Sequence, residues 1–416
     1  DVKTDRVEAV ARDLRVEQAP LDYRSGRQAA GGSLVPPDGW DDLRIAGAGA
    51  RHLLIGAAAA GWGVPFEECS TTSGTVTHEA SGRSATHASL LAAAAGLPAP
   101  AVSELRLKSR PEEFRLLGRF VPGVDNGKIL TGQPLFGCDV RLEGMLYAVF
   151  EKCPAFGGKV RSANVEEIRQ LPGVTHAFVV EGTTNLSGLM PGVAIVADSW
   201  WQASEARKQL KVDWAVTHAD SSADYERQAE ILRTQPGATL RADGDVESAL
   251  AAARQVVEAS YYYPFVAHAN LEPQNCTALL HESGRLELWA PSQNPKGGRQ
   301  LIAETLGIAE DRIHVNLARI GGGFGRRLVN DFMVEAAWIA REVRRPVQLQ
   351  WTREDDLGHD FYRPAAWHHF RAGLGDDGRM SAFDHHFVTF GRDGRPVSGA
   401  DLAPGHYPAG LVPNFR

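Results

Sequence analysis

A chain of 416 residues, 43% of them hydrophobic, is long enough for about two to four domains with substantial cores. Its 44 basic and 51 acidic residues give a formal net charge of −7, without a long basic stripe or a lysine-rich tail, so nucleic acid is not an expected partner. No stretch reaches the roughly 18 apolar residues that a helix needs to span a bilayer.

The first region, residues 1–110, is rich in alanine and mostly helical in pattern. Apolar residues recur at intervals of three and four over 41–64, which predicts a helix. Residues 75–83 are predicted to form a hairpin, and 85–96 a helix that ends at a glycine. The polar, proline-rich segment 97–113 is predicted to be a linker.

The second region, residues 114–216, is predicted to form a compact α+β module. Segments of alternating hydrophobicity are followed by short amphipathic segments, which is the pattern of strands and helices in turn. The predicted strands are 144–152, 176–182, 193–199 and 211–214, and the predicted helices are 164–174 and 200–210.

The third region, residues 237–416, is rich in predicted strands. The predicted strands are 254–263, 285–291, 312–320 and 346–352, and the predicted helices are 296–308 and 330–343. Strands and helices are therefore mixed along the chain, and the fold class predicted from these patterns is α+β.

The four cysteines, Cys69, Cys138, Cys153 and Cys276, form no C-x-x-C motif. This argues against an iron–sulfur cluster or a structural zinc site held by the chain itself. Cys153 and Cys276 have apolar and small neighbours, so both are predicted to pack as small hydrophobic side chains.

The stretch IGGGFGRR (320–327) lies between a predicted strand and a predicted helix. At such a turn, successive backbone N–H groups and the helix N-terminus favour an anion, and glycine permits close approach of the backbone. The spacing of a Walker A loop is absent, and no acidic residue follows at the next strand end as in a dinucleotide-binding motif. Taken alone, the stretch favours a structural turn.

Three further motifs change this interpretation. The four stretches HANLEPQNCTA (268–278), WAPSQNPKG (289–297), IGGGFGRR (320–327) and WTREDDLGHDFYRPA (351–365) occur in this order, about 20 to 30 residues apart. Together they resemble the molybdenum hydroxylases, the xanthine dehydrogenase and aldehyde oxidase superfamily. Residues 118–154 are similar to that family's hammerhead α/β domain. The branch that the chain most resembles contains the molybdopterin-binding large subunits of isoquinoline 1-oxidoreductases and of bacterial membrane-associated aldehyde dehydrogenases.

The resemblance implies a domain organisation. A hammerhead-type α/β module at 114–216 would be followed by a first molybdopterin-binding α+β domain at 237–416, after the helix-rich region 1–110. In the family, the general-base glutamate lies in a second cofactor-binding domain, and no counterpart of that domain is found in this chain. We therefore expect a C-terminal companion chain or segment to supply the base.

The resemblance also implies site residues. Gln293 matches the glutamine that donates a hydrogen bond to the oxo group of the molybdenum centre. An amide suits this role, because it donates without adding charge beside the metal. Arg363 matches an arginine of the substrate pocket, where a fixed guanidinium stabilises developing negative charge. Phe324 and Gly325 match the turn whose amides approach the metal's ligands and the pterin. The predicted cofactor-binding residues are Gly321, Gly322, Gly323, Phe324, Gly325, Arg326 and Gln293.

Each of these residues also has an ordinary structural interpretation. Gln293 would then be a loop amide, Arg363 a surface ion-pair partner and Phe324 a core side chain. Valine at Gly322 or Gly323 is expected to abolish cofactor retention, because a β-branched side chain would block the approach of the backbone. No metal ligand from the chain itself is predicted.

One residue departs from the xanthine-type pattern. Leu328 occupies the place of a glutamate that follows the glycine–phenylalanine turn in those enzymes. A purine substrate is therefore not expected, and a less polar N-heteroaromatic compound or an aldehyde is predicted instead.

The implied reaction inserts a water-derived oxygen at an electron-poor C–H carbon. The cofactor would be molybdopterin with molybdenum, in the cytosine dinucleotide form, and electrons would leave through [2Fe-2S] clusters on a separate small subunit. Cytochrome c is the expected further acceptor, and the periplasm or the periplasmic face of the membrane is the expected location, with the cytoplasm as the alternative. The rival hypothesis is a non-catalytic cofactor-binding or scaffold subunit whose partner carries the base.

Other candidate sites are weaker. His368-His369 and His385-His386 suggest a metal site, but adjacent residues on a strand point to opposite faces, so neither pair readily chelates one ion. The acidic run 354–356 suggests a cation site, but it is predicted instead to cap a turn. A Gly-x-Ser-x-Gly motif is absent, which leaves a hydrolase without support.

Overall fold

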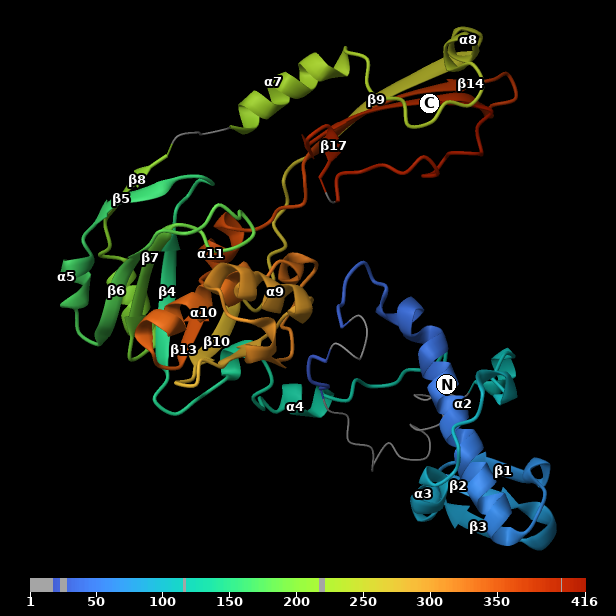
Figure 1. Ribbon diagram of the computed structural model, residues 1–416. Coiled ribbons are helices and arrows are strands. Elements are labelled where there is room, and N and C mark those ends of the chain that lie inside the picture. Colours follow the sequence, from blue (N-terminus) through green and yellow to red (C-terminus); the bar gives the residue numbers. More distant parts are fainter. Residues whose placement is uncertain (1–17, 23–27, 115–116, 217–220, 398) are drawn as a thin grey trace. The chain divides into compact units, whose positions relative to one another are not determined.

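The computed structural model describes residues 18–22, 28–114, 117–216, 221–397 and 399–416. The chain forms two compact units, Asp1–Leu135 and Phe136–Arg416, each with its own sheets and helices (Figure 1). Among the described residues, no helix has both the length and the apolar character needed to cross a membrane.

The first unit is built on the long helix α2 (Val35–Trp62). Prolines at its first positions suit a helix start, and Gly63 ends it in the left-handed conformation at φ 67°. The helix packs on the three-stranded antiparallel sheet β1-β2-β3 through Ile55, Ala58 and Val76. The remaining elements are β1 (Cys69–Thr72), β2 (Thr75–His78), β3 (Arg83–Thr86), α3 (His87–Ala95) and α4 (Asn126–Leu130). The predicted helices and hairpin are confirmed.

A seven-stranded mixed sheet forms the centre of the second unit, in the order β12-β11-β10-β13-β4-β7-β6. Its strands are β4 (Leu146–Lys152), β6 (Val174–Val180), β7 (Gly192–Ala197), β10 (Asn275–Leu280), β11 (Leu286–Ala290), β12 (Ile313–Leu317) and β13 (Val347–Gln350). Every residue of β7 is buried, as expected of a central strand covered on both faces.

Helices and loops complete this part of the fold. Helix α10 is buried along most of its length and contacts β10 and β13. The other elements around the sheet are α5 (Val165–Arg169), α6 (Trp200–Arg207), α9 (Pro295–Leu306), α10 (Asp331–Val343), α11 (Arg353–Gly358), β5 (Lys159–Ala163) and β8 (Val212–Ala215). The predicted strands and helices of residues 144–352 are confirmed, with boundaries that differ by a few residues.

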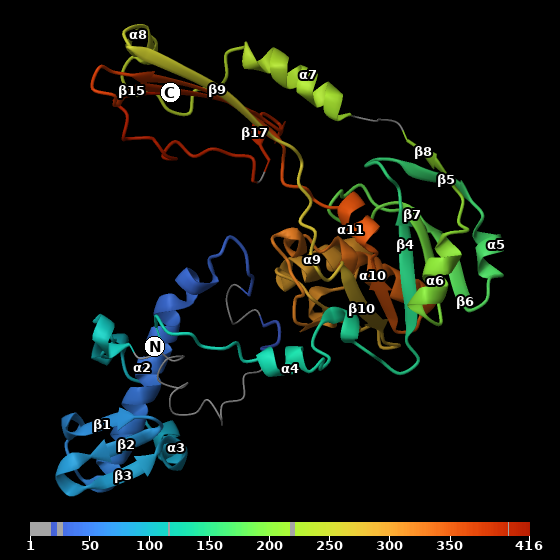
Figure 2. The same ribbon diagram turned by 180° about the vertical axis from the view of Figure 1, so that it is seen from behind.

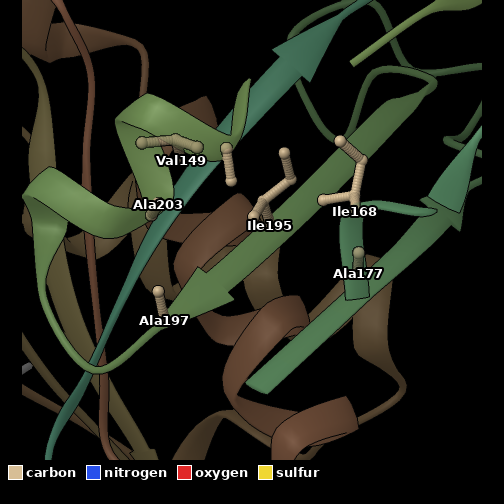
Figure 3. Close-up of a cluster of buried hydrophobic side chains, with 7 residues drawn as sticks. Val149, Ile168, Ala177, Ile195, Ala197 and Ala203 are labelled. Atoms are coloured by element: carbon tan, nitrogen blue, oxygen red, sulfur yellow. The ribbon is translucent and has the colours of Figure 1, made fainter. Parts of the chain in front are cut away.

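One hydrophobic cluster joins helices α5 and α6 to strands β4, β6 and β7 (Figure 3). Small side chains on α6 let the helix approach the sheet closely, while Ile168 and Ile195 fill the space between the elements. The buried members are Val149, Ile168, Ala177, Ile195, Ala197, Ala203 and Ala206.

The seven-stranded sheet combines strands from two of the predicted regions. Strand β4, from the predicted module 114–216, pairs in parallel with β13, from the predicted domain 237–416, with Val347 opposite Leu146. Both regions therefore contribute to one sheet, within the compact unit that begins at Phe136. The predicted domain boundaries stay a prediction. Hydrophobic alternation identifies a strand but not its partner, so the sequence could not show this pairing.

A separate four-stranded sheet has the order β18-β15-β14-β9 (Figures 1 and 2). Its strands are β9 (Gln255–Tyr263), β14 (Ala366–Leu374), β15 (Met380–Thr389) and β18 (Asn414–Phe415). Helices α7 (Ser222–Arg233) and α8 (Val246–Ala251) contact β15, and the short strands β16 (Gly391–Arg392) and β17 (Arg395–Pro396) form a ribbon. Segments 264–274 and 351–365 connect this sheet to the seven-stranded one.

A buried ion pair ties β4 to helix α10. Lys152 Nζ lies 3.2 Å from Glu335 Oε1, and both side chains are 1% exposed. Trp351 Nε1 donates to Glu335 Oε2 at 2.9 Å, and Lys152 Nζ lies 3.0 Å from the centroid of the Trp351 ring. Burial raises the pKa of Glu335 to about 7 although Lys152 opposes the shift, and burial lowers the pKa of Lys152. Each charge is therefore tolerated only because the other is present.

Removing one partner of this pair is expected to destabilise the protein. Lys152→Met should lower the free energy of unfolding by about 3–5 kcal/mol, because it leaves a buried carboxylate without a counter-charge. Protonation of Glu335 relieves that cost in the folded state. The folded state then binds more protons than the unfolded one, and the loss should grow as the pH rises from about 5 to 8.

Denaturant titrations of the wild-type protein and of Lys152→Met at about pH 5 and about pH 8 measure this effect. Adding Glu335→Gln to Lys152→Met should recover much of the stability and remove the added pH dependence. A double variant as unstable as the single one at pH 8 would contradict the buried-charge explanation.

Candidate functional site

The glycine stretch forms a strained turn between strand β12 and helix α10. Three of its residues have positive φ: Gly322 at 104°, Phe324 at 53° and Gly325 at 110°. Phe324 is the exception among these, because a side chain rarely adopts this conformation, and its ring is 64% exposed. An exposed aromatic side chain held in a strained turn marks a candidate functional site.

Backbone packing explains two of the glycines. A Cβ on Gly321 would lie 2.4 Å from Cβ of Glu272, and a Cβ on Gly323 would lie 2.5 Å from Oε1 of Gln293. Both distances are shorter than real contacts, so any side chain would push the neighbouring segment away. The glycines therefore let the turn lie directly against the loops that carry Glu272 and Gln293.

The turn presents a row of unbonded N–H groups. Gly321 N–H donates to Glu272 Oε2 at 2.8 Å, and Gly325 N–H donates to Gln293 Oε1 at 3.1 Å. Between them, the N–H groups of Gly322, Gly323 and Phe324 make no hydrogen bond within the described part of the chain. Successive N–H groups in such a conformation attract electron-rich atoms of a ligand.

The side chain of Arg327 fixes the turn through hydrogen bonds to backbone carbonyl oxygens. Its side chain is fully buried and donates to the carbonyl oxygens of Gly322 at 2.9 Å, Pro291 at 3.0 Å and Glu272 at 2.8 Å. The guanidinium also lies 3.2 Å from the Glu272 carboxylate. One side chain thus links the turn, the loop before α9 and the segment before β10.

Arg326 is equally buried but points to other partners. Its guanidinium donates to both oxygens of Asp331 at 2.9 Å and lies 3.1 Å from Asp360 Oδ1. Its side chain is therefore bound inside the protein, which is a positioning role. The prediction that Arg326 binds the cofactor directly stays a prediction, and these contacts do not support it.

Gln293 lies in the loop between β11 and α9. Its backbone N–H donates to the carbonyl of Arg327 at 3.0 Å, and its Oε1 accepts from Gly325, so the amide is fixed against the turn with its NH2 group as the donor end. Neighbouring bonds stiffen this loop: Ser292 Oγ bonds to Asn330 at 2.6 Å, and Asn294 caps α9. The structure thus brings Gln293 and the glycine turn together.

Arg363 reaches the turn from the segment before β14. Its Nη2 donates to the carbonyl of Phe324 at 3.0 Å, and its side chain is otherwise exposed. Arg363 therefore contacts the strained residue itself. Leu328 is 37% exposed, so together with the Phe324 ring it gives this region an apolar surface.

Glu272 is a site residue that the sequence reasoning missed. Its carboxylate accepts from Gly321 N–H at 2.8 Å, from Asn275 at 2.9 Å and from the Cys138 N–H at 3.2 Å, and it pairs with Arg327. The motif HANLEPQ contained the signal, because a glutamate beside proline in an otherwise uncharged stretch is a candidate for a buried partner.

The weaker candidate sites have clear outcomes. Cys153 and Cys276 are buried and free, as predicted, and burial raises the pKa of Cys276. Asp355 caps α11 in a capping box with Thr352, which confirms the turn-cap prediction, and it also binds Arg207. Within the described residues, no group of three or more histidine, cysteine or acidic side chains is placed to hold a metal ion.

The two histidine pairs contact each other across the sheet. Neighbouring histidines do point apart, but histidines of different pairs meet across the sheet. His368 Nδ1 lies 2.8 Å from His385 Nε2, on adjacent strands β14 and β15. The sequence argument considered each adjacent pair by itself and so missed this cross-strand contact.

The turn, the fixed glutamine and the buried arginines all lie in one α+β part of the chain. Residues 230–391, which contain all of these groups, match the model of the molybdopterin cofactor-binding domain. The fold is similar to that of the aldehyde oxidoreductase from Desulfovibrio gigas, with a TM-score of 0.54 at 19% identity, covering 73% of this chain and 38% of that one.

Sequence comparison gives the family. The chain is 30% identical to the isoquinoline 1-oxidoreductase subunit beta of Brevundimonas diminuta, covering 91% of this chain and 53% of that protein. It is 27% identical to a membrane-bound aldehyde dehydrogenase of Gluconacetobacter polyoxogenes, covering 97% of this chain and 54% of that protein. The chain belongs to the molybdenum hydroxylase superfamily, and it spans about half the length of these two curated relatives.

A single added methyl group tests the contact between the turn and the glutamine. Gly323→Ala should displace the Gln293 amide, break its bond to Gly325 N–H and lower the free energy of unfolding by about 1–3 kcal/mol. Urea denaturation measures the loss. Gly49→Ala in helix α2 is the control, because its Cβ would meet no atom within 4 Å. If Gly323→Ala is as stable as this control, the close packing described above is wrong.

Proposed function

We propose that this chain is the molybdopterin-binding portion of the large subunit of a molybdenum-dependent oxidoreductase. The reaction would hydroxylate an N-heteroaromatic compound or oxidise an aldehyde with a water-derived oxygen. The observation that carries the proposal is the row of N–H groups at Gly322, Gly323 and Phe324, which bond to none of the described residues and lie beside Gln293 inside the matched domain.

The residues fit such a cofactor. Phe324 is the one residue of 321–325 with a side chain, so a large electron-rich ligand can approach the row of backbone N–H groups directly. Those three N–H groups and the NH2 group of Gln293 would hold the cofactor, and all four donors are uncharged. When bound, the molybdenum–pterin group supplies the two-electron oxidation of the substrate carbon.

The chain's own residues orient the reactants. Gln293 is fixed by Gly325, and its amide would donate to the cofactor without adding charge. Arg363 holds the carbonyl of Phe324, and its exposed guanidinium edge would stabilise negative charge on a substrate. The strained turn at Phe324 would place that aromatic ring where a planar substrate stacks.

The apolar surface supports the proposed substrate class. Phe324 and Leu328 are both partly exposed and offer no charged group to a purine. The relatives are named for isoquinoline and for aldehydes, which fits a less polar aromatic heterocycle or an aldehyde as the substrate of this chain.

The proposal extends to partners. A small subunit with [2Fe-2S] clusters would receive the electrons, and cytochrome c would take them further. A companion chain or segment would carry the second cofactor-binding domain with its base glutamate, and the cofactor would be the cytosine dinucleotide form. We place the complex in the periplasm or at the periplasmic face of the membrane on the resemblance alone.

Isolation of the native complex tests the assignment. We expect molybdenum and pterin in the complex that contains this chain, together with reduction of an artificial acceptor by an aldehyde or an N-heteroaromatic compound. A complex without molybdenum would overturn the cofactor assignment. Molybdenum without oxidation of either substrate class would overturn the catalytic assignment and favour a scaffold subunit.

Substitution of Gln293 tests whether this residue takes part in the reaction. Gln293→Leu should lower turnover about 100-fold or more while the sheet remains folded, because one preorganised donor is lost. Gln235→Leu removes an exposed glutamine outside the site and is the control. Equal turnover in the two variants would remove Gln293 from the site.

A further inference from the structure

A buried histidine faces the glycine turn without a role in the account above. His268 lies in the segment between β9 and β10, with its side chain 9% exposed. Its Nδ1 lies 2.9 Å from Asp360 Oδ1, and its backbone N–H donates to Asp360 Oδ2 at 2.5 Å. Ala269, the next residue, has φ of 50°, so the backbone is strained where it carries the imidazole to this position.

Asp360 determines which nitrogen of His268 carries the proton. The Asp360 side chain is 1% exposed and forms a buried ion pair with Arg326, whose Nε lies 3.1 Å from Oδ1. A carboxylate only accepts hydrogen bonds, so the proton of a neutral imidazole must lie on Nδ1. Nε2 is then left with its lone pair.

His268 Nε2 lies beside the turn. A Cβ on Gly325 would lie 3.2 Å from this nitrogen, so no side chain could stand between it and the glycine. Nε2 makes no hydrogen bond with any of the described residues. Beside a row of N–H donors, the site thus contains one acceptor that no described residue uses.

We propose that His268 is a cofactor-binding residue whose Nε2 accepts a hydrogen bond from a ring N–H group of the pterin bound at the glycine turn. The inference rests on the proposed function. The backbone N–H row serves the electron-rich side of that ligand, and His268 serves its N–H edge. Asp360 and Arg326 are positioning residues, which gives Arg326 a part in the site without direct contact.

The proton position can be measured without any cofactor. Protein labelled with 15N-histidine should show that the neutral ring of His268 carries its proton on Nδ1 and not on Nε2. In Asp360→Asn, the amide NH2 can donate to Nδ1, so the preference for this tautomer should weaken or reverse. A proton on Nε2 in the wild-type protein would overturn the inference, whatever the chain binds.

Loading the complex with molybdopterin gives a second measurement. The Nε2 resonance of His268 should shift in the direction of hydrogen-bond acceptance, while His314, on strand β12, should not change. An unchanged His268 resonance in protein that has taken up the cofactor would refute the contact.

Two substitutions separate the functions of the two ring nitrogens. His268→Asn can keep the bond to Asp360 but has no acceptor at the Nε2 position, whereas His268→Gln retains an acceptor farther along the side chain. We expect cofactor to dissociate about three- to tenfold faster from the asparagine variant than from wild type, with partial rescue in the glutamine variant. His314→Gln is the control.

The failure of this inference differs from failure of the proposed function. If no variant and no wild-type complex takes up molybdopterin, the proposed function is wrong. If wild type takes it up and His268→Asn releases it at the wild-type rate, only the role of His268 is wrong.

Discussion

The site depends on one buried charge. Arg327 is enclosed by protein, and a guanidinium in such surroundings is stable only when its donors are bonded. The available acceptors are carbonyl oxygens of Gly322, Pro291 and Glu272, together with the Glu272 carboxylate. Satisfying the charge therefore fixes three segments that lie far apart in the sequence. The shape of the turn is set before a ligand arrives, so little ordering remains to be done on binding.

Arg326, the adjacent arginine, bonds to the segments on the other side of the site. Arg326 pairs with Asp331, which begins helix α10, and with Asp360, which holds the imidazole of His268. Two consecutive residues thus connect the turn to the loop of Gln293 on one side and to His268 on the other. Lysine could replace neither arginine, because one ammonium group lacks the forked geometry needed to reach several fixed acceptors.

Part of this could be predicted from the sequence. Alternation and helical periodicity located most elements, and the resemblance of four ordered motifs to a known family predicted the turn, Gln293 and Arg363 as site residues. Strand partners could not be predicted, since periodicity does not encode which buried strand lies beside β4. Arg326 was assigned to the cofactor because no local pattern shows that a carboxylate 34 positions later, Asp360, lies beside it. The contacts of Glu272 and His268 also join residues that are far apart in the sequence, so local patterns could not predict them.

Residue-resolved hydrogen exchange of the turn, in cofactor-free and loaded protein, tests the central claim of a preformed site most directly. The amides of Gly321 and Gly325 are bonded within the protein and should be protected in both states. Those of Gly322, Gly323 and Phe324 should exchange freely without cofactor and become protected when it binds. Rapid exchange at Gly321 and Gly325 in the cofactor-free protein would show that the turn is not preformed. Unchanged exchange at the three central amides on loading would show that they do not hold the ligand.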